Sequence, residues 1–172
     1  IERMKDQAPK YFLDFRQTAR YTRALARDME EWSRHFSDFD LDHWDTIRVV
    51  IGTHERWNNS WGGFNGVFLA IREEVTGDDV FTEYGHIKHD DDIGAFEGPV
   101  YQRLAALITH EMAHSIEQQI GTLSTGRTGK GYPGHITHDE DWQDVYRILR
   151  NTFVNGKENE KWFKERWQKA KP

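Results

Sequence analysis

The sequence predicts a single α+β domain, and three observations support this. A short β-branched run at 47–51 and a short apolar run at 67–71 gather before one long apolar helical pattern. Helical patterns also flank this region at both ends of the chain. At 172 residues the chain has the length of one ordinary domain, and it contains no repeat or linker that would divide it. We therefore expect one domain over 1–172, in which a small mixed sheet packs on the central helix.

The composition is that of a soluble globular protein. Apolar residues make up only 37%, but seven Trp, six Tyr and ten Phe supply large buried areas. The absence of cysteine excludes disulfide bonds and thiolate metal ligands. The net charge of −6 makes nucleic acid an unexpected partner, and we interpret the basic runs near both termini as solvated helix faces.

No membrane contact is expected, because no apolar run approaches the roughly 20 residues of a membrane span. A charged-then-apolar leader is also absent, which favours a cytoplasmic protein. The chain begins with Ile1 rather than Met, so the sequence is equally compatible with a leader that has been removed.

The N-terminal region has apolar residues at helical spacing from about 9 to 35, which predicts one long amphipathic helix or two abutting ones. We expect this helical arm to pack on the sheet of its own domain rather than on a partner. The segment 36–45 is rich in aspartate but lacks the glycine and the closing glutamate of an EF-hand. It is predicted to be a solvated loop.

Two strands are predicted at 47–51, a β-branched run, and at 67–71, a short apolar run. Turn-forming residues dominate 58–63 between them. The simplest interpretation is a pair of strands joined by a long polar loop.

The next segment contains a predicted turn at 76–79 and a weaker strand candidate at 80–88, which ends at the aspartates of 90–92. His86 and His89 lie beside these acids. We expect them on a solvent-facing edge strand rather than in a second cation site.

The central helix is predicted from about Pro99 to Ile120. Proline is tolerated in a first helical turn, and Gly121 is placed where a left-handed cap would stop the helix. Apolar residues recur every fourth position along one face, which should form the core: Leu104, Ile108, Met112 and Ile116.

The other face of this helix carries His110, Glu111 and His114 in the pattern H-E-x-x-H. Residues four apart lie one above the other on a helix, so the two imidazoles can bind one metal ion. Glu111 is rotated from them and can reach a water on that metal, where a general base is needed. This is the signature of a zinc hydrolase, and the alternative is a chance match on a solvated helix.

The segment 122–134 contains four glycines and is predicted to be an irregular surface loop, of the kind that often covers active sites. A helix should begin near 137, where acids suit the helix dipole, and a short terminal helix should span 158–171. Apolar anchors are Trp142, Val145, Tyr146, Leu149 and Phe153 in the first helix, and Trp162, Phe163 and Trp167 in the second.

A catalytic zinc ion normally takes three protein ligands and keeps a fourth position for water. Three residues beyond the motif helix are candidates for the third ligand: His135, His138 and Glu140. The metzincin class is excluded, because the glycine and histidine that it requires after the second histidine are Glu117 and Ile120 here.

Two motifs, H-E-M-A-H at 110–114 and H-D-E-D-W at 138–142, are separated by a glycine-containing loop and resemble the SprT-like zincin metallopeptidases. The segment 55–63 is loosely similar to the stretch before that family's strands. The resemblance covers about 47–153 and leaves the N-terminal arm unexplained. Asp139 stands where the family usually has glycine, and the zinc ribbon of some members is absent.

The resemblance implies a zincin-like metallopeptidase fold with Glu111 as the catalytic base. The zinc ligands that it implies are His110, His114 and His138. Within this interpretation we favour His138 over Glu140 and His135 as the third ligand.

The leading functional hypothesis is therefore a zinc metalloendopeptidase that acts on a protein or peptide substrate, with Glu111 as general base. Tyr132 or His135 could donate a hydrogen bond to the developing oxyanion. By resemblance, a strand at 84–89 would pair with an extended substrate.

Two alternatives remain open. One is a non-catalytic zinc-binding module that uses its N-terminal arm as a partner surface, and it requires a closed metal site. The other is a protease that acts on nucleoprotein through local basic patches.

Overall fold

The computed structural model describes nine segments of the chain: 10–12, 14–39, 45–53, 60–71, 74–76, 89–94, 96, 98–125 and 140–172. Within them the chain forms four α-helices, one 3-10 helix and two small sheets, which confirms the α+β class. The helices are α1 (Phe15–His35), α2 (Val100–Thr125), α3 (Glu140–Phe153) and α4 (Lys157–Lys169), and the 3-10 helix is η1 (Ser37–Phe39). None of the described helices is long and apolar enough to cross a membrane.

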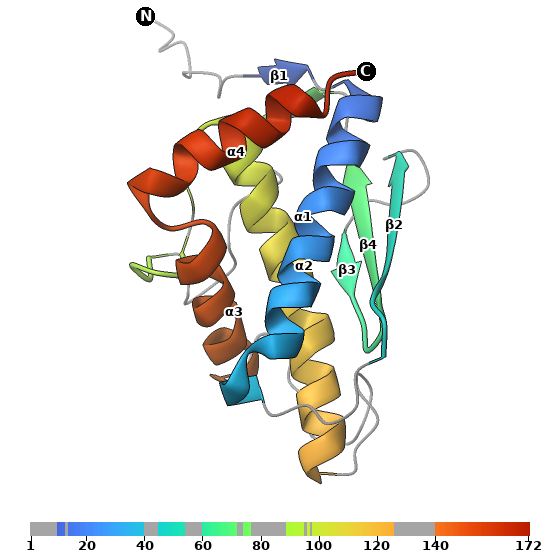
Figure 1. The fold of residues 1–172 in the computed structure, drawn as a ribbon, viewed down its shortest axis with the longest axis vertical. Coiled ribbons are helices and arrows are strands. Elements are labelled where there is room, and N and C mark those ends of the chain that lie inside the picture. The colour runs from blue at the N-terminus through green and yellow to red at the C-terminus, as the bar shows by residue number, and fades with distance from the viewer. Residues whose placement is uncertain are drawn as a thin grey trace, which may run out of the picture.

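The fold is built around α2, as Figure 1 shows. The larger sheet lies on one side of this helix and α3 on the other, while α1 crosses in front of it and α4 packs near its first turns. The core is continuous across these elements and includes the face predicted for it: Leu104, Ile108, Met112 and Ile116 are all buried. Burial on every side distinguishes α2 from an ordinary surface helix.

The larger sheet contains β2 (Arg48–Thr53), β4 (Gly66–Ile71) and β3 (Trp61–Gly62), in the spatial order β2-β4-β3. The first two strands are parallel, and β3 is antiparallel to β4, so the sheet is mixed as expected. Both predicted strands are confirmed. The segment predicted as a turn at 58–63 contains β3, because pairing with β4 imposes an extended conformation on Trp61 and Gly62, although glycine has little strand propensity of its own.

The N-terminal prediction was wrong in two respects. Lys10–Phe12 is a strand, β1, that pairs antiparallel with β5 (Glu74–Thr76), and the helix begins only at Phe15. Asp14 sets this start, because its Oδ1 accepts a hydrogen bond from the Gln17 backbone N–H at 2.8 Å. The apolar side of α1, expected on the sheet, packs mainly on α2.

The motif helix starts as predicted, since the Pro99 carbonyl accepts hydrogen bonds from the amides of Gln102 and Arg103, both at 3.0 Å. It does not stop at Gly121 but continues to Thr125. Glycine permits a left-handed cap without requiring it, and it costs a helix interior only about 1 kcal/mol. The predicted loop at 122–134 therefore begins no earlier than 126.

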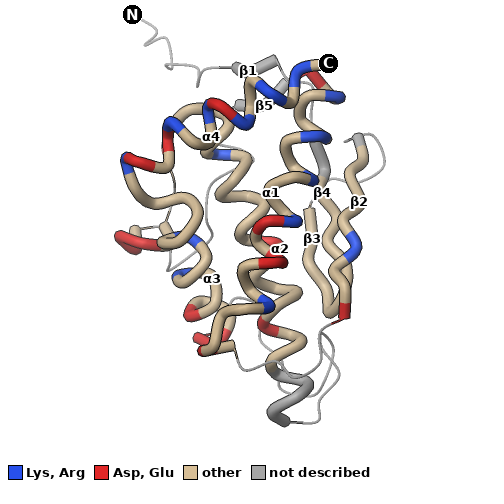
Figure 2. Tube along the Cα trace, in the orientation of Figure 1, with Lys and Arg blue, Asp and Glu red and all other residues tan. Residues whose placement is uncertain are grey.

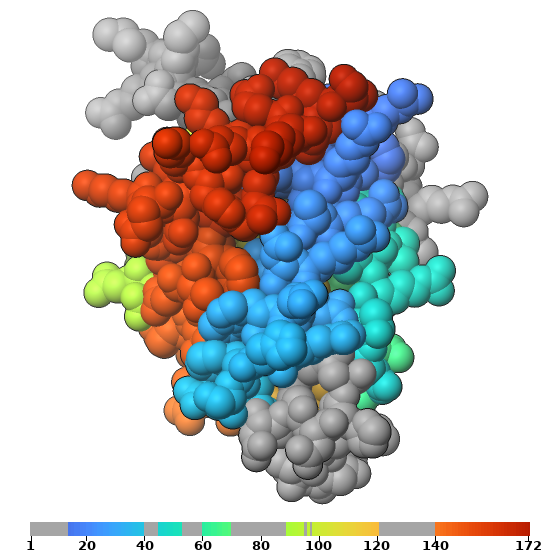
Figure 3. All heavy atoms as spheres, viewed as in Figure 1, coloured from blue at the N-terminus to red at the C-terminus, as the bar shows by residue number. Residues whose placement is uncertain are grey.

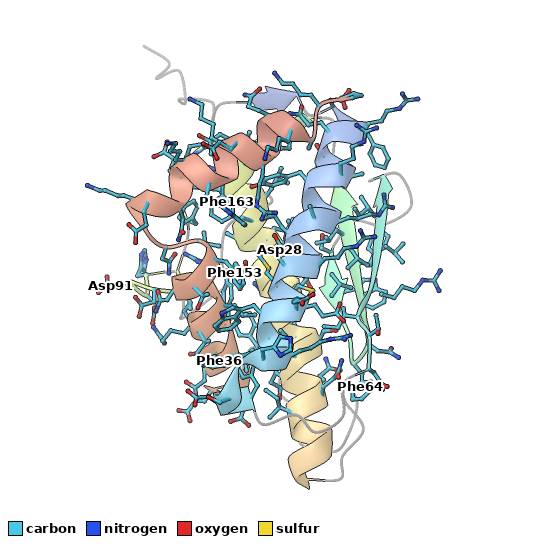
Figure 4. All side chains as sticks on the ribbon, in the orientation of Figure 1. Asp28, Phe36, Phe64, Asp91, Phe153 and Phe163 are labelled. Carbon is cyan, nitrogen blue, oxygen red and sulfur yellow. The ribbon has the colours of Figure 1, made fainter. Side chains whose placement is uncertain are left out.

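The two C-terminal helices are confirmed, with Phe163 buried and Trp142 enclosed by α2 and α3. Aromatic contacts join the end of α3 to the end of α1: the Trp32 ring stacks on Phe36 at 4.5 Å and meets Phe153 edge-on at 5.6 Å. Figure 4 labels Phe36 and Phe153 of these aromatic contacts, together with Phe163 of α4.

Several predictions fall on segments that the structure does not describe. These are the strand at 80–88 with His86, half of the loop at 36–45, most of the loop at 122–134, and the residues Tyr132, His135, His138 and Asp139. Within the segment 36–45, which was predicted as a solvated loop, η1 forms a helical turn in which Phe39 is buried. His89 is exposed in a turn.

The turn that precedes α2 is held against α3 by ion pairs. Arg147 bonds both oxygens of Asp90 at 3.0 Å and Asp92 Oδ2 at 2.8 Å. Asp90 Oδ1 also accepts hydrogen bonds from the backbone amides of Asp92 and Ile93. The Arg147 guanidinium and these amides hold the pKa of the Asp90 carboxyl well below its usual range.

We expect Asp90→Asn to lower the free energy of unfolding at pH 7 by about 1 kcal/mol, because the amide cannot form the ion pair. The pKa of Asp90 is lower in the folded chain than in the unfolded chain, so its ionisation stabilises the fold above about pH 4. That contribution is lost as the pH falls toward the folded pKa, and the difference from wild type should shrink in acid. Urea unfolding of the wild type and of Asp90→Asn, at pH 7 and in acid, measures this difference in the free energy of unfolding.

The exposed neighbour Asp91, labelled in Figure 4, provides a matched control. Asp91→Asn should change stability by less than about 0.5 kcal/mol. If Asp90→Asn lowers the free energy of unfolding by the same amount in acid and at neutral pH, the ion-pair explanation is contradicted.

Candidate metal centre

The middle of α2 holds a cluster of metal-binding side chains. Each of His110, Glu111 and His114 offers one donor atom, and these atoms lie within 4.8 Å of one another. All three residues are buried, with exposed fractions of 7%, 5% and 7%. The face predicted to present ligands is therefore enclosed by other elements, because α2 is covered on several sides.

One wall of the cluster is the backbone of β3. A Cβ atom added at Gly62 would overlap the carbonyl oxygen of Glu111 and would lie 2.8 Å from the Cβ of His114. Real Cβ atoms do not approach other atoms this closely. Only glycine at position 62 therefore lets β3 approach the motif helix without a shift of one of them.

Side chains that follow the motif hold β3 and its turn against α2. The Ser115 hydroxyl donates to the Gly63 carbonyl, and Gln119 Nε2 donates to the Phe64 carbonyl at 3.1 Å. Gln119 also exchanges two hydrogen bonds with the backbone of Asp45, at 2.9 and 3.1 Å. Ser115 and Gln119 were not predicted as part of the site, although their four-residue spacing places them on one side of the predicted helix.

The opposite wall is aromatic and comes from α3. The Trp142 ring stacks on the His114 imidazole, with centroids 5.0 Å apart and planes at 22°, and its centroid is 4.8 Å from that of His110. Trp142 Nε1 donates to the His110 carbonyl at 3.4 Å. The Tyr146 ring meets His110 edge-on at 5.4 Å. These contacts restrict the rotation of both imidazoles.

A buried arginine supports the aromatic wall from behind. Arg150 is only 3% exposed, and its NH1 donates to the Tyr146 hydroxyl at 2.8 Å and to the Gly94 carbonyl at 3.2 Å. Its guanidinium also lies over the Phe96 ring, 5.4 Å from the centroid. Arg150 thus connects the segment before α2 to the residue that contacts His110.

The chemistry of the donors fits a zinc ion. Two imidazoles and a carboxylate are zinc ligand types, and the two imidazole rings are 5.1 Å apart between centroids. Two ligand atoms of one tetrahedral zinc are about 3.3 Å apart when each bond is about 2.0 Å. His110 Nε2 and Glu111 Oε1 are 4.0 Å apart, which suits a carboxylate beside the metal better than one bound to it.

Of the three candidates for the third ligand, only Glu140 lies in the described part of the chain. It is the first residue of α3, is exposed, and does not belong to the cluster. Two helical positions separate it from the buried Trp142, so the two side chains leave α3 in nearly opposite directions. Glu140 is therefore poorly placed for the metal.

No protein-family model, curated protein or solved structure matches this chain. The resemblance to the SprT-like metallopeptidases thus rests on the two motifs alone. The structure supports the coarser conclusion that His110, Glu111 and His114 form a cluster that could hold a metal ion.

We expect Gly62→Ala to lower the free energy of unfolding by about 2 kcal/mol, because the new methyl group must displace either β3 or α2. The matched control is Gly66→Ala in β4, where the nearest atom to an added Cβ is the Arg48 carbonyl oxygen at 3.8 Å. Chemical denaturation of both variants measures the free energy of unfolding, and zinc titration measures their affinity for the metal. Equal stability of the two variants would contradict the close approach of β3 to the motif.

Proposed function

We propose that this chain is a zinc-dependent metallopeptidase that hydrolyses peptide bonds, with Glu111 as general base. The observation that carries the proposal is the buried cluster of His110, Glu111 and His114 on one helix, with their donor atoms within 4.8 Å. Two histidines one turn apart with a glutamate directly after the first are the arrangement that metallopeptidases of the H-E-x-x-H type use.

We assign the third ligand to His138. It precedes Trp142 by four residues in the sequence, and Trp142 contacts both imidazoles of the cluster. Trp142, the third residue of α3, therefore lies against the cluster, which supports a ligand from the residues just before this helix. The exposure of Glu140 favours His138 further, while His135 remains the alternative.

When bound, a zinc ion would supply Lewis acidity that lowers the pKa of a water molecule toward about 7 and polarises a carbonyl group. The Glu111 carboxylate, beside the two histidines, would take the proton from the attacking water. It would then deliver that proton to the amine nitrogen as the peptide C–N bond breaks, which leaves a carboxylate and an amine as products. Because Glu111 is buried and bulk water is excluded, the electrostatic interactions of its carboxylate are stronger than they would be in water.

Other parts of the proposed mechanism rest on sequence alone. Tyr132 or His135 would donate to the developing oxyanion, and the segment 84–89 would pair with the main chain of a protein or peptide substrate. The two oxyanion candidates and most of the pairing segment lie outside the described residues.

A second candidate function is a non-catalytic module in which zinc stabilises a protein-interaction domain. The observation that favours it is the burial of all three cluster residues, since structural zinc sites are closed to solvent. The two candidates differ in the role of Glu111. A catalytic base is needed only in the enzyme.

The wild-type chain should bind one zinc ion, and loss of a true ligand should weaken binding by more than the 10- to 100-fold typical of residues around the ligands. His110→Ala and His138→Ala should both do so, whereas Glu140→Ala should leave the affinity unchanged. Elemental analysis and competition with a chromophoric chelator provide the measurement. If Glu140→Ala loses zinc and His138→Ala keeps it, the third ligand is Glu140.

Glu111→Gln should keep zinc and the fold, because the amide is nearly isosteric and this residue is not a ligand. It should lower peptidase activity by roughly 10²- to 10⁴-fold through loss of the base. Digestion of a peptide library by the two zinc-loaded proteins tests this. Undiminished cleavage by Glu111→Gln would refute the assigned base, and zinc-loaded wild type that cuts no peptide would favour the structural module.

A further inference from the structure

The solvent face of α1 carries a straight row of arginines: Arg16, Arg20, Arg23 and Arg27. Their spacings of four, three and four residues place them within about 60° of one another around the helix axis, at about 100° per residue. All four are exposed, and no acidic residue interrupts the row. Figure 2 shows the corresponding basic positions at successive turns of α1.

The opposite side of α1 is buried. Tyr21, Leu25 and Met29 are each 1% exposed or less, and the Tyr21 hydroxyl donates to the Tyr101 carbonyl on α2. These residues lie roughly half a turn away from the arginines, so the row faces away from α2 and its metal cluster. Figure 3 shows α1 open to solvent along its length on this face of the molecule.

Within the part of the chain that the structure describes, no carboxylate neutralises the charges of the row. Among the described residues, neither Arg16, Arg20, Arg23 nor Arg27 forms an ion pair, whereas Arg166 pairs with Asp28, labelled in Figure 4. Arginines one turn apart repel each other, which destabilises the helix slightly. An anionic partner would relieve that repulsion.

We propose that the arginine row binds the phosphate backbone of a nucleic acid. The row is linear and about 16 Å long, at 1.5 Å per residue. Over that length a DNA duplex presents about five phosphates on each strand. Guanidinium groups bind phosphate oxygens through paired hydrogen bonds, which favours arginine at such contacts. A membrane surface fits less well, because helices that lie on membranes add large apolar side chains to their basic ones.

The net charge of −6 made nucleic acid an unexpected partner from the sequence. Salt limits electrostatic interactions between exposed charges to about 8–10 Å, so a partner on the row responds to its four arginines and to Glu31 one turn beyond Arg27, rather than to the distant acids that dominate the net charge. The basic N-terminal run is solvent-exposed as expected. Its linear arrangement, for which the described residues supply no carboxylate partner, is what points to a phosphate backbone.

The test uses the full 172-residue chain and a fluorescent DNA duplex, with binding measured by anisotropy over a range of salt concentrations. The row variant is Arg20→Gln, Arg23→Gln and Arg27→Gln. The control is Lys157→Gln, Lys161→Gln and Lys164→Gln on α4, which removes the same charge from exposed positions. Circular dichroism checks that both variants keep their helices.

Wild type should bind the duplex at about 50 mM salt, and the row variant should bind at least about tenfold more weakly, with a log–log salt dependence flatter by about 2.7. The control should stay within about threefold of wild type, and Glu111→Gln should bind as wild type does, since this surface is independent of the proposed peptidase. No binding by wild type, or equal loss in both triple variants, would overturn the proposal. Binding to phosphatidylserine vesicles in place of the duplex would also overturn it and would assign the row to membranes.

Discussion

The enclosure of α2 is the constraint on which the rest of this structure depends. A helix with apolar residues on one side and histidine, glutamate, serine and glutamine on the other cannot be buried unless neighbouring elements satisfy the polar groups. Here Ser115 and Gln119 bond the turn around β3, and Thr109 bonds the Ala105 carbonyl within the helix at 2.6 Å. The polar side of α2 is thus an organised part of the interior.

The same enclosure shapes the candidate metal centre. Its two described walls differ in kind: the Gly62 backbone approaches from the sheet, and the Trp142 indole stacks on His114 from α3. Both walls limit the rotamers of the imidazoles before any ion binds, which is the preorganisation that a tight metal site requires. Arg150 extends this support to the segment before α2 through Tyr146. The candidate metal centre is therefore in contact with, or supported by, three separate regions of the chain.

Charged residues of one type serve different purposes according to their partners. Arg147 is matched with Asp90 and Asp92 and fastens a turn, while Arg150 is buried against aromatic rings and carbonyl groups. The arginine row of α1 (Arg16, Arg20, Arg23 and Arg27) has no carboxylate partner among the described residues and is available to an anion, whereas Arg34 at the end of the same helix pairs with Glu30. Net charge averages over these situations, which explains why it is a poor guide to local binding.

Local patterns in the sequence were sufficient for much of this protein. The four-residue spacing of His110 and His114 determined that both imidazoles share one helix face, and periodicity located α2, α3, α4 and the strands β2 and β4. These features depend on residues within one or two turns of each other. The same locality accounts for the correct start of α2 after Pro99.

Only the tertiary structure decided the features that depend on distant residues. Trp61 and Gly62 become a strand because β4 pairs with them, and Lys10–Phe12 because β5 does. Gly121 does not end α2, although its sequence context allows a cap. Glu140 and Trp142 are two residues apart, yet packing against α2 buries one and leaves the other exposed. Such outcomes follow from long-range contacts, whose free energies outweigh local propensities of a few tenths to about 1 kcal/mol per residue.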